Sequence, residues 1–230
     1  MKKIGLFLLA TAALFLGSCK EKEYDGADSA FVVTVRTMPV GSEYYFDADT
    51  GHTIYPSDKS RIGAYEAREG QRAIITFKSL PSIPGYDISA RLYSIGDIYT
   101  GTGRIIADAE EVAELSDDPI QLYRAGSYLT HKYLTLYVVY SANDKTKHRF
   151  ELVVNDATPS STDPNYLDVE LRHAADGDLT GPHCEDYISF DITPFTARLS
   201  GKNGIALRVR TGVQPNSIQT YKIDFTQTGR

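Results

Sequence analysis

The chain has 230 residues, with 24 Lys and Arg against 30 Asp and Glu, so its formal net charge at pH 7 is −6. This sign argues against nucleic acid as a partner, because neutralising phosphates needs a basic surface. Apolar residues make up 42% of the chain, and the length suits two small domains or one large β domain. The chain has 16 Tyr, no Trp and recurrent Val, Ile and Thr, so we predict an all-β protein.

The first 19 residues have the pattern of an export signal. Two lysines precede an apolar run over residues 4–16, and the letters LGSC occupy positions 16–19. The run is shorter than the about 20 residues that a spanning helix needs, whereas a short apolar core with a small-residue junction is typical of a secretory signal. An ordinary cleaved signal does not require the cysteine. The pattern resembles the lipobox of bacterial lipoproteins, which implies a signal peptide over residues 1–18 and lipidation at Cys19.

Residues 19–30 are polar and show no periodicity, which indicates a flexible tether. Two or three acyl chains anchor a protein stably, since each buried methylene contributes about 0.8 kcal/mol. We therefore expect the protein in the bacterial cell envelope, held on the outer membrane through its lipid. The acidic, Lys-containing start of the tether also resembles signals that route some Gram-negative lipoproteins to the cell surface. The sequence does not decide whether the protein faces the cell surface or the periplasm.

Residues 31–106 predict a five-stranded OB-like barrel. FVVTVR at 31–36 alternates its side chains with the period of a half-buried strand. A hairpin follows, with Asp-Thr-Gly at 49–51 as its turn, because glycine takes positive φ without strain. Two further β-prone runs, at 72–78 and 87–99, bring the count to the five strands of an OB fold.

The character of the chain changes at ADAEEVAELSDDP, residues 107–119, which we interpret as a linker with one or two helical turns. Residues 120–230 then return to strand patterns. In YLTLYVVY at 133–140 both faces are apolar, which predicts a central strand. Further alternating runs lie at 149–155, 167–172, 188–192, 205–209 and 221–225. Regular strands with turns between them predict an antiparallel β-sandwich.

Several segments taken together resemble one known family. In chain order they are TIYPSD, GQRAIITF, PGYDISARLYSIGDI, YLTLYVVYSA, NYLDVELRH and ISFDITPF, all after the lipobox. Over residues 19–226 the chain is similar to the NigD-like lipoproteins. This resemblance implies an N-terminal OB domain and a C-terminal β-sandwich domain, and its motifs are structural. The family name traces to bacteriocin-associated operons, which implies a role such as immunity or export.

The stretch HAADGDLTGPHCEDY carries every residue type that metal sites use. Its candidate ligands are His173, Asp176, Asp178, His183, Cys184, Glu185 and Asp186. No HxxxH or CxxC spacing fixes a geometry, and Asp-Gly-Asp at 176–178 equally suits a hairpin turn. The sequence leaves open whether the loop at 176–186 binds a cation, which would be calcium rather than zinc. Adjacent His183 and Cys184 point to opposite sides of an extended chain, so a thiol nucleophile would need another base, such as His173.

Asp-Ala-Asp-Thr-Gly at 47–51 superficially matches the start of an EF-hand loop. That loop needs glycine one position later and a bidentate Glu where Asp58 stands, so we interpret the residues as a turn. The sequence has no serine elbow, phosphate loop or nucleotide-binding glycine motif. We therefore predict no catalytic residues, no metal and no cofactor.

The OB-like domain offers the better candidate site. OB barrels bind ligands on strands 2 and 3 and in the adjoining loops, which here are residues 44–55 and the loop at 81–85. The candidate ligand contacts are Tyr44, Tyr45, Phe46 and Tyr55. The alternative is that half of these rings fill the barrel and the rest pack against the second domain.

We expect a non-enzymatic envelope lipoprotein that acts as a binding or scaffold module. Its partner would be an envelope protein or an extracellular ligand. The first alternative is an accessory of a surface uptake system that binds a glycan or a peptide. The less favoured alternative is a hydrolase that uses the His/Cys/Asp stretch at 173–186.

Overall fold

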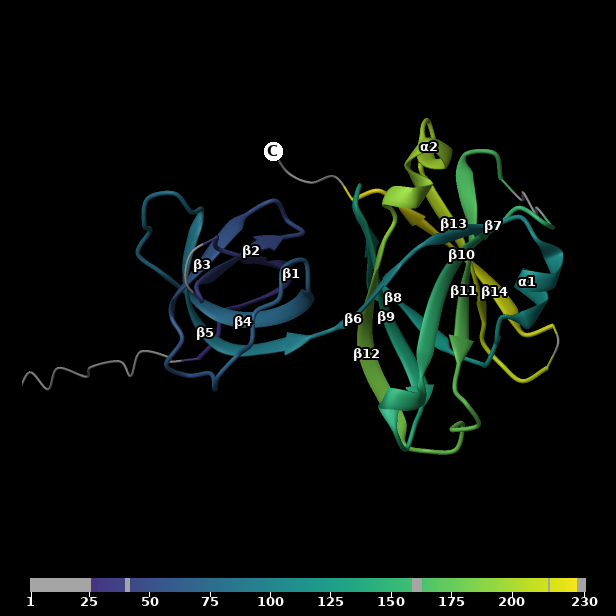
Figure 1. Ribbon diagram of the computed structural model, residues 1–230, viewed down its shortest axis with the longest axis horizontal. Helices are drawn as coiled ribbons and strands as arrows, with labels where there is room; N and C mark the ends of the chain where they lie inside the picture. The colour runs from purple at the N-terminus through teal and green to yellow at the C-terminus, as the bar shows by residue number, and fades with distance from the viewer. Residues whose placement is uncertain (1–25, 40–41, 159–162, 215, 227–230) are drawn as a thin grey trace, which may run out of the picture.

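The computed structural model describes residues 26–39, 42–158, 163–214 and 216–226. The chain is all-β, with a closed barrel followed by two packed sheets, as the sequence predicts (Figure 1). Among the described residues, no helix is both long and apolar enough to cross a membrane. The predicted signal peptide, Cys19 and the first part of the tether lie outside the described residues.

The barrel has the strand order of an OB fold, β1-β2-β3-β5-β4 with closure onto β1. Its strands are β1 (Ser29–Thr37), β2 (Tyr44–Ala48), β3 (Thr53–Asp58), β4 (Arg72–Leu80) and β5 (Ile88–Asp97). Alternate side chains of each strand fill the interior, among them Val33, Phe46, Ile75 and Leu92. Gly51, at φ +89°, turns β2 into β3, so the hairpin prediction at this position is confirmed.

The chain passes from the barrel into the sandwich earlier than the sequence suggested. The sequence predicts that residues 99–106 belong to the barrel and that residues 107–119 form a linker. Instead β6 (Tyr99–Thr102) pairs with β12 and β7 (Arg104–Ile106) pairs with β10, both in the sandwich. Strands of four and three residues are too short to show alternation. The change in composition at residue 107 marks a helix, α1 (Ala109–Glu114), within the second domain.

Two sheets face each other in the second domain (Figure 1). One has the order β6-β12-β9-β8 and the other the order β14-β13-β11-β10-β7. The strands not yet bounded are β8 (Gln121–Leu129), β9 (Tyr133–Ser141), β10 (Arg149–Asn155), β11 (Tyr166–Ala174), β12 (His183–Asp191), β13 (Gly204–Arg210) and β14 (Ile218–Asp224). A short helix, α2 (Thr196–Leu199), precedes β13. Strand β9 lies between two others, so its predicted central position is confirmed.

The sandwich is mixed rather than wholly antiparallel. Three ladders are parallel, β6–β12, β7–β10 and β11–β13. Parallel neighbours need a crossover connection, and between β11 and β13 the chain supplies one by running through β12 in the other sheet. Strands β6 and β7 form almost one stretch that changes sheet at Gly103. A Cβ there would lie 2.4 Å from the ring of Phe195, so only glycine fits the crossing.

A buried arginine joins the two domains. Arg72 begins β4, and its side chain is 0% exposed. It donates two hydrogen bonds to the Asp49 carboxylate in the β2–β3 turn, one of them 2.7 Å long. On the sandwich side, its Nε lies 3.2 Å from Ser189 Oγ and its guanidinium lies 4.1 Å from the centre of the Tyr133 ring. The charge is therefore paired by the barrel and enclosed by the sandwich.

Two further contacts hold the domains in this position. The Tyr128 hydroxyl, from β8, donates to Asp49 Oδ2 at 2.7 Å. Only Ile98 separates β5 from β6, and its amide donates to the Arg72 carbonyl at 3.0 Å. Because the linker is one residue long and hydrogen-bonded to the barrel, the domains have little freedom to rotate apart.

Replacing Arg72 with Ala should destabilise the protein by about 3–5 kcal/mol, because Asp49 then keeps a largely buried charge without its partner. The measurement is urea unfolding of the chain from Lys20 onward. Arg104→Ala is the control, since Arg104 is 46% exposed and its ion pairs with Glu111 and Glu151 lie at the surface. It should cost less than about 1 kcal/mol. Equal effects of the two substitutions would contradict the role given to Arg72.

Candidate functional site

Three tyrosines gather on the outer face of the barrel, over strands β2 and β3. Tyr45 on β2 and Tyr55 on β3 are half-buried, and pairing of Phe46 with Ile54 places them opposite each other. Tyr86, from the loop between β4 and β5, lies between them. Its ring centre is 4.9 Å from that of Tyr55 and 5.6 Å from that of Tyr45. We call Tyr45, Tyr55 and Tyr86 the barrel tyrosine cluster.

Two of the four predicted ligand contacts, Tyr44 and Phe46, lie in the interior of the barrel. Tyr44 is 4% exposed and Phe46 is fully buried, and both rings belong to the barrel core. Side chains alternate along a strand, so Tyr45 cannot share a face with its two neighbours. Tyr44 and Phe46 are therefore unavailable to a ligand, as the core-filling alternative expected. Tyr45 and Tyr55 do point outward.

Sequence reasoning ends the candidate loop at Gly85 and therefore leaves out Tyr86. Asp87, which directly follows Tyr86, explains how Tyr86 is held in place. Asp87 accepts from the Thr53 amide at 2.7 Å and from the Thr53 hydroxyl at 2.8 Å, which ties the loop to the start of β3. These hydrogen bonds lower the pKa of the Asp87 carboxyl, so the loop stays fixed at neutral pH.

An ion pair lies at one side of the cluster. Lys59 Nζ is 3.0 Å from Glu43 Oε2, and the Tyr55 hydroxyl donates to the same oxygen at 3.3 Å. The hydrogen bond from Lys59 lowers the pKa of Glu43, and partial burial raises the pKa of Tyr55. The cluster thus offers ring faces beside one carboxylate and one ammonium group. This suits stacking with hydrogen bonding, the pattern by which proteins recognise flat or extended ligands.

The candidate metal residues at 173–186 do not converge. Asp176 pairs with Arg149 at 2.6 Å, and the φ of +47° at Asp176 marks a turn. Asp178 accepts from the Asn143 and Asp144 amides at 2.8 and 2.7 Å, so it holds the loop after β9. Within the described part of the chain, no three His, Cys, Asp or Glu side chains form a group that could hold a metal.

His183 and Cys184 are consecutive residues of β12 and lie on opposite faces. The Cys184 sulfur lies 3.7 Å from the Pro182 carbonyl and 3.9 Å from the Ala142 carbonyl. A carbonyl oxygen cannot remove the thiol proton, so these neighbours do not activate the sulfur. The EF-hand-like aspartates are engaged as well, Asp47 with Arg36 and Asp49 with Arg72.

His173 instead forms a buried pair with His148. The two rings stack, and His148 Nδ1 lies 2.8 Å from His173 Nε2. Burial, followed by the neighbouring His148, lowers the pKa of His173. The other ring nitrogen of His173 lies 3.3 Å from the Pro119 carbonyl. Both histidines are therefore packed between the sheets beside Tyr140 and Phe150.

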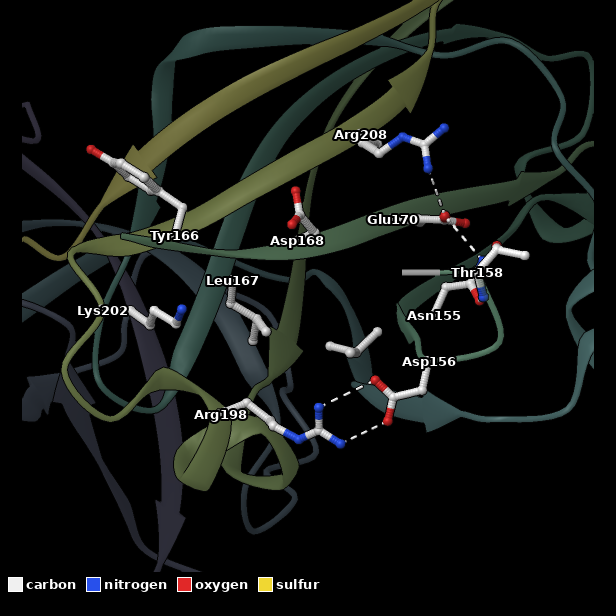
Figure 2. A pocket seen from close by; sticks show the side chains of 11 residues that line it. Asn155, Asp156, Thr158, Tyr166, Leu167, Asp168, Glu170, Arg198, Lys202 and Arg208 are labelled. Atoms are coloured by element: carbon white, nitrogen blue, oxygen red, sulfur yellow. Dashed lines mark hydrogen bonds and ion pairs between the residues drawn. The ribbon is translucent and has the colours of Figure 1, made fainter. Parts of the chain in front are cut away.

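A small hollow of about 200 Å³ lies between β10, β11, β13 and the α2 region. Figure 2 shows its charged groups facing one another. Arg198 bridges both oxygens of Asp156, and Arg208 donates to Glu170 at 3.0 Å. Lys202 donates to the Pro164 carbonyl at 2.5 Å. Because these charges are already paired, the hollow is better explained as a structural network than as a ligand site.

Two family descriptions match the chain, and together they cover both domains. The NigD-like N-terminal OB domain matches residues 32–98, and the NigD-like C-terminal beta sandwich domain matches residues 104–225. The chain belongs to the NigD-like family. The first match ends at Ile98, where the chain leaves the barrel, and the second begins at Arg104, the first residue of β7. The predicted family and fold are confirmed.

Solved structures show the same fold at low sequence identity. A protein of unknown function from Bacteroides vulgatus is 20% identical, with a TM-score of 0.72 over 87% of this chain and 92% of that one. A candidate lipoprotein from Bacteroides fragilis is 15% identical, with a TM-score of 0.67 over 86% and 98%. A NigD-like immunity protein from Bacteroides caccae is 19% identical, with a TM-score of 0.60 over 84% and 91%. A comparison with curated proteins finds no match.

The lowered pKa of the buried His173 predicts that stability depends on pH. The lowered pKa of folded His173 means that the unfolded chain binds a proton first, near the ordinary value of 6.5. Stability should therefore fall as the pH drops below about 6.5, by at most about 1.4 kcal/mol per pH unit for one proton. Urea unfolding at pH 7, 6 and 5 measures this slope. His173→Phe should reduce it, whereas His52→Phe, at the exposed β2–β3 turn, should leave it unchanged.

Proposed function

We propose that this NigD-like chain is a non-enzymatic binding module of the cell envelope, anchored through a lipid on Cys19. The observation that carries the proposal is the barrel tyrosine cluster, which occupies the face and the loop that OB barrels use for ligands. Its rings are partly exposed and its ion pair lies at one side. Figure 1 places β3 on the side of the barrel away from the sandwich, so a partner can reach it.

The chemistry of the remaining groups supports binding rather than catalysis. A hydrolase needs a nucleophile within hydrogen-bond reach of a base. Cys184 lies beside carbonyl oxygens, and His173 is stacked in the sandwich core against His148. The partner is therefore an envelope protein or an extracellular ligand, held and not transformed.

Two narrower forms of this proposal differ in their ligand. An accessory of a surface uptake system would hold a glycan or a peptide against the tyrosine rings. The second form is a bacteriocin-associated role, in immunity or export, and its immunity version is supported by the similarity to the NigD-like immunity protein from Bacteroides caccae. Both forms need the outer-membrane position that the export signal implies, on either its surface or its periplasmic side.

The partner can be captured and mapped in one experiment. Lipidated protein is cross-linked in envelopes and purified in three forms: wild type, Tyr86→Ala and Tyr123→Ala. The wild type should retain a specific partner, and Tyr86→Ala should reduce the recovered amount at least fivefold, since an aromatic contact contributes about 1–3 kcal/mol. Tyr123, which is 50% exposed on the sandwich, is the matched control and should change nothing.

A partner that both variants recover equally would contradict a site on the barrel. A bacteriocin encoded beside the gene, if it is the captured molecule, would favour the immunity form. A glycan or peptide would favour the uptake form.

The anchor has a separate test. Metabolic labelling with palmitate should tag the wild-type chain, and Cys19→Ala should lose the label and release the protein from the membrane fraction. Ser18→Ala keeps a small residue at the junction and serves as the control, with full labelling expected. A labelled Cys19→Ala variant would rule out this cysteine as the lipid site.

A further inference from the structure

A hollow lies at the seam between the domains. It measures about 590 Å³ and is lined by the end of β5, by β6 and by β9, β10 and β12. We call it the seam groove. It is lined by both faces of β12, with Glu185 and Tyr187 on one face and Asp186 and Ile188 on the other. A hollow that touches both faces of a strand lies along the edge of that strand.

That edge of β12 is open for half of its length. β6 pairs only with residues 188–191 of β12, whereas β9 pairs with residues 183–191 on the opposite side. Within the described part of the chain, no strand covers residues 183–187 on the side of β6. Exposure changes at the same point, since Ile188 is buried and Glu185 is exposed. Half of the backbone N–H and C=O groups of this segment therefore face the groove.

The facing strand is less accessible to a new neighbour. β7 covers only residues 153–155 of β10, but the Tyr99 hydroxyl donates to the Phe150 carbonyl at 2.7 Å. The Tyr99 side chain thus occupies the edge of β10 within the groove. An added strand would pair with β12 and continue the line of β6 beyond Tyr99.

The side chains along this edge define what such a strand would carry. On the inner face, the rings of Tyr140 and Phe150 line the groove and favour an apolar side chain. On the outer face stands Glu185, whose Oε2 accepts from the Tyr137 hydroxyl. The other carboxylates of the groove are matched by cations, Asp186 by Lys145 and Asp97 by Arg68. The described residues place no cation within ion-pair distance of Glu185, so a basic ligand group fits there.

We propose that the seam groove docks an extended peptide of a partner protein, which adds to the open edge of β12 and sets a Lys or Arg side chain against Glu185. Main-chain hydrogen bonds supply the affinity, and the alternating environments of the two faces select the sequence. The groove is separate from the barrel tyrosine cluster, so this site does not depend on the function proposed above.

The test begins with a displayed library of random dodecapeptides selected on the lipidated protein in detergent micelles. The enriched peptides should carry Lys or Arg within an alternating apolar pattern. Affinity of the best peptide should fall about three- to fivefold with Glu185→Gln, as for an exposed ion pair. Glu114→Gln, on α1, is the matched control and should leave the affinity unchanged.

N-methylation of the peptide tests strand addition directly, because it removes one backbone donor at a time. Only every second amide of an added strand faces β12, so alternate positions should lose at least tenfold in affinity while their neighbours lose little. Tyr86→Ala should bind the peptide as the wild type does, which separates this result from any failure of the barrel site.

The proposal is overturned if no peptide is enriched above a column without protein. It is equally overturned if the enriched peptides bind Glu185→Gln as well as wild type, or if N-methylation shows no alternation. A glycan array probed in parallel supplies the competing outcome, since saturable glycan binding that Glu185→Gln weakens would assign the groove to a sugar.

Discussion

The Arg72 guanidinium is fully buried between the two domains. The relative position of the domains follows from the charge and the hydrogen-bond acceptors that each of them supplies to this group. A buried charge needs both an opposite charge and hydrogen-bond acceptors. Asp49 supplies the charge from the barrel, Thr34 accepts at 2.9 Å from the same domain, and Ser189 accepts from the sandwich. If the sandwich docked in another orientation, the guanidinium would lose its sandwich partners. The interaction therefore selects one arrangement of the domains rather than adding much net stability.

Two surfaces take their form from that arrangement. The seam groove exists because the end of β5 stands beside β12, where β6 covers only part of the strand. The sandwich contacts the barrel at Arg72 and Asp49. The barrel tyrosine cluster remains exposed because Tyr55 lies on β3 and Tyr86 lies in the loop between β4 and β5. One contact thus divides the barrel into an internal interface and an outward face that carries the barrel tyrosine cluster.

Most of the charged groups in the described chain are committed to structure. Arg198 with Asp156, Arg210 with Asp117 and Lys222 with Asp163 bind loops and strands to each other. The buried histidines are stacked in the sandwich core, and Cys184 faces carbonyl oxygens. The exposed rings of the barrel tyrosine cluster, the Glu185 carboxylate and the open edge of β12 are the groups on which the proposals rest. The family match and the solved structures establish the fold.

The sequence by itself determined the family, the all-β class, the five barrel strands and the central position of β9. These features depend on local sequence, because the alternation of side chains within each strand and the turn residues between strands can be recognised in short segments. Half of the candidate ligand contacts were also readable, since Tyr45 alternates with the buried Tyr44 and Phe46 and Tyr55 with the buried Ile54 and Pro56. Alternation alone cannot say which of the two faces becomes the core.

Only the tertiary structure decided the features that depend on pairing between distant segments. β6 and β7 are too short for a periodic signal, so their place in the sandwich came from hydrogen bonding to β12 and β10. Pairing between distant segments also produced the parallel ladders and the burial of Arg72. It likewise brought Tyr86 into the barrel tyrosine cluster. The stretch at 173–186 has the residue types of a metal site but no ligand spacing that fixes a geometry, and the fold disperses these residues because β11 and β12 belong to different sheets. Composition records which groups are present, and only the fold sets the distances between them.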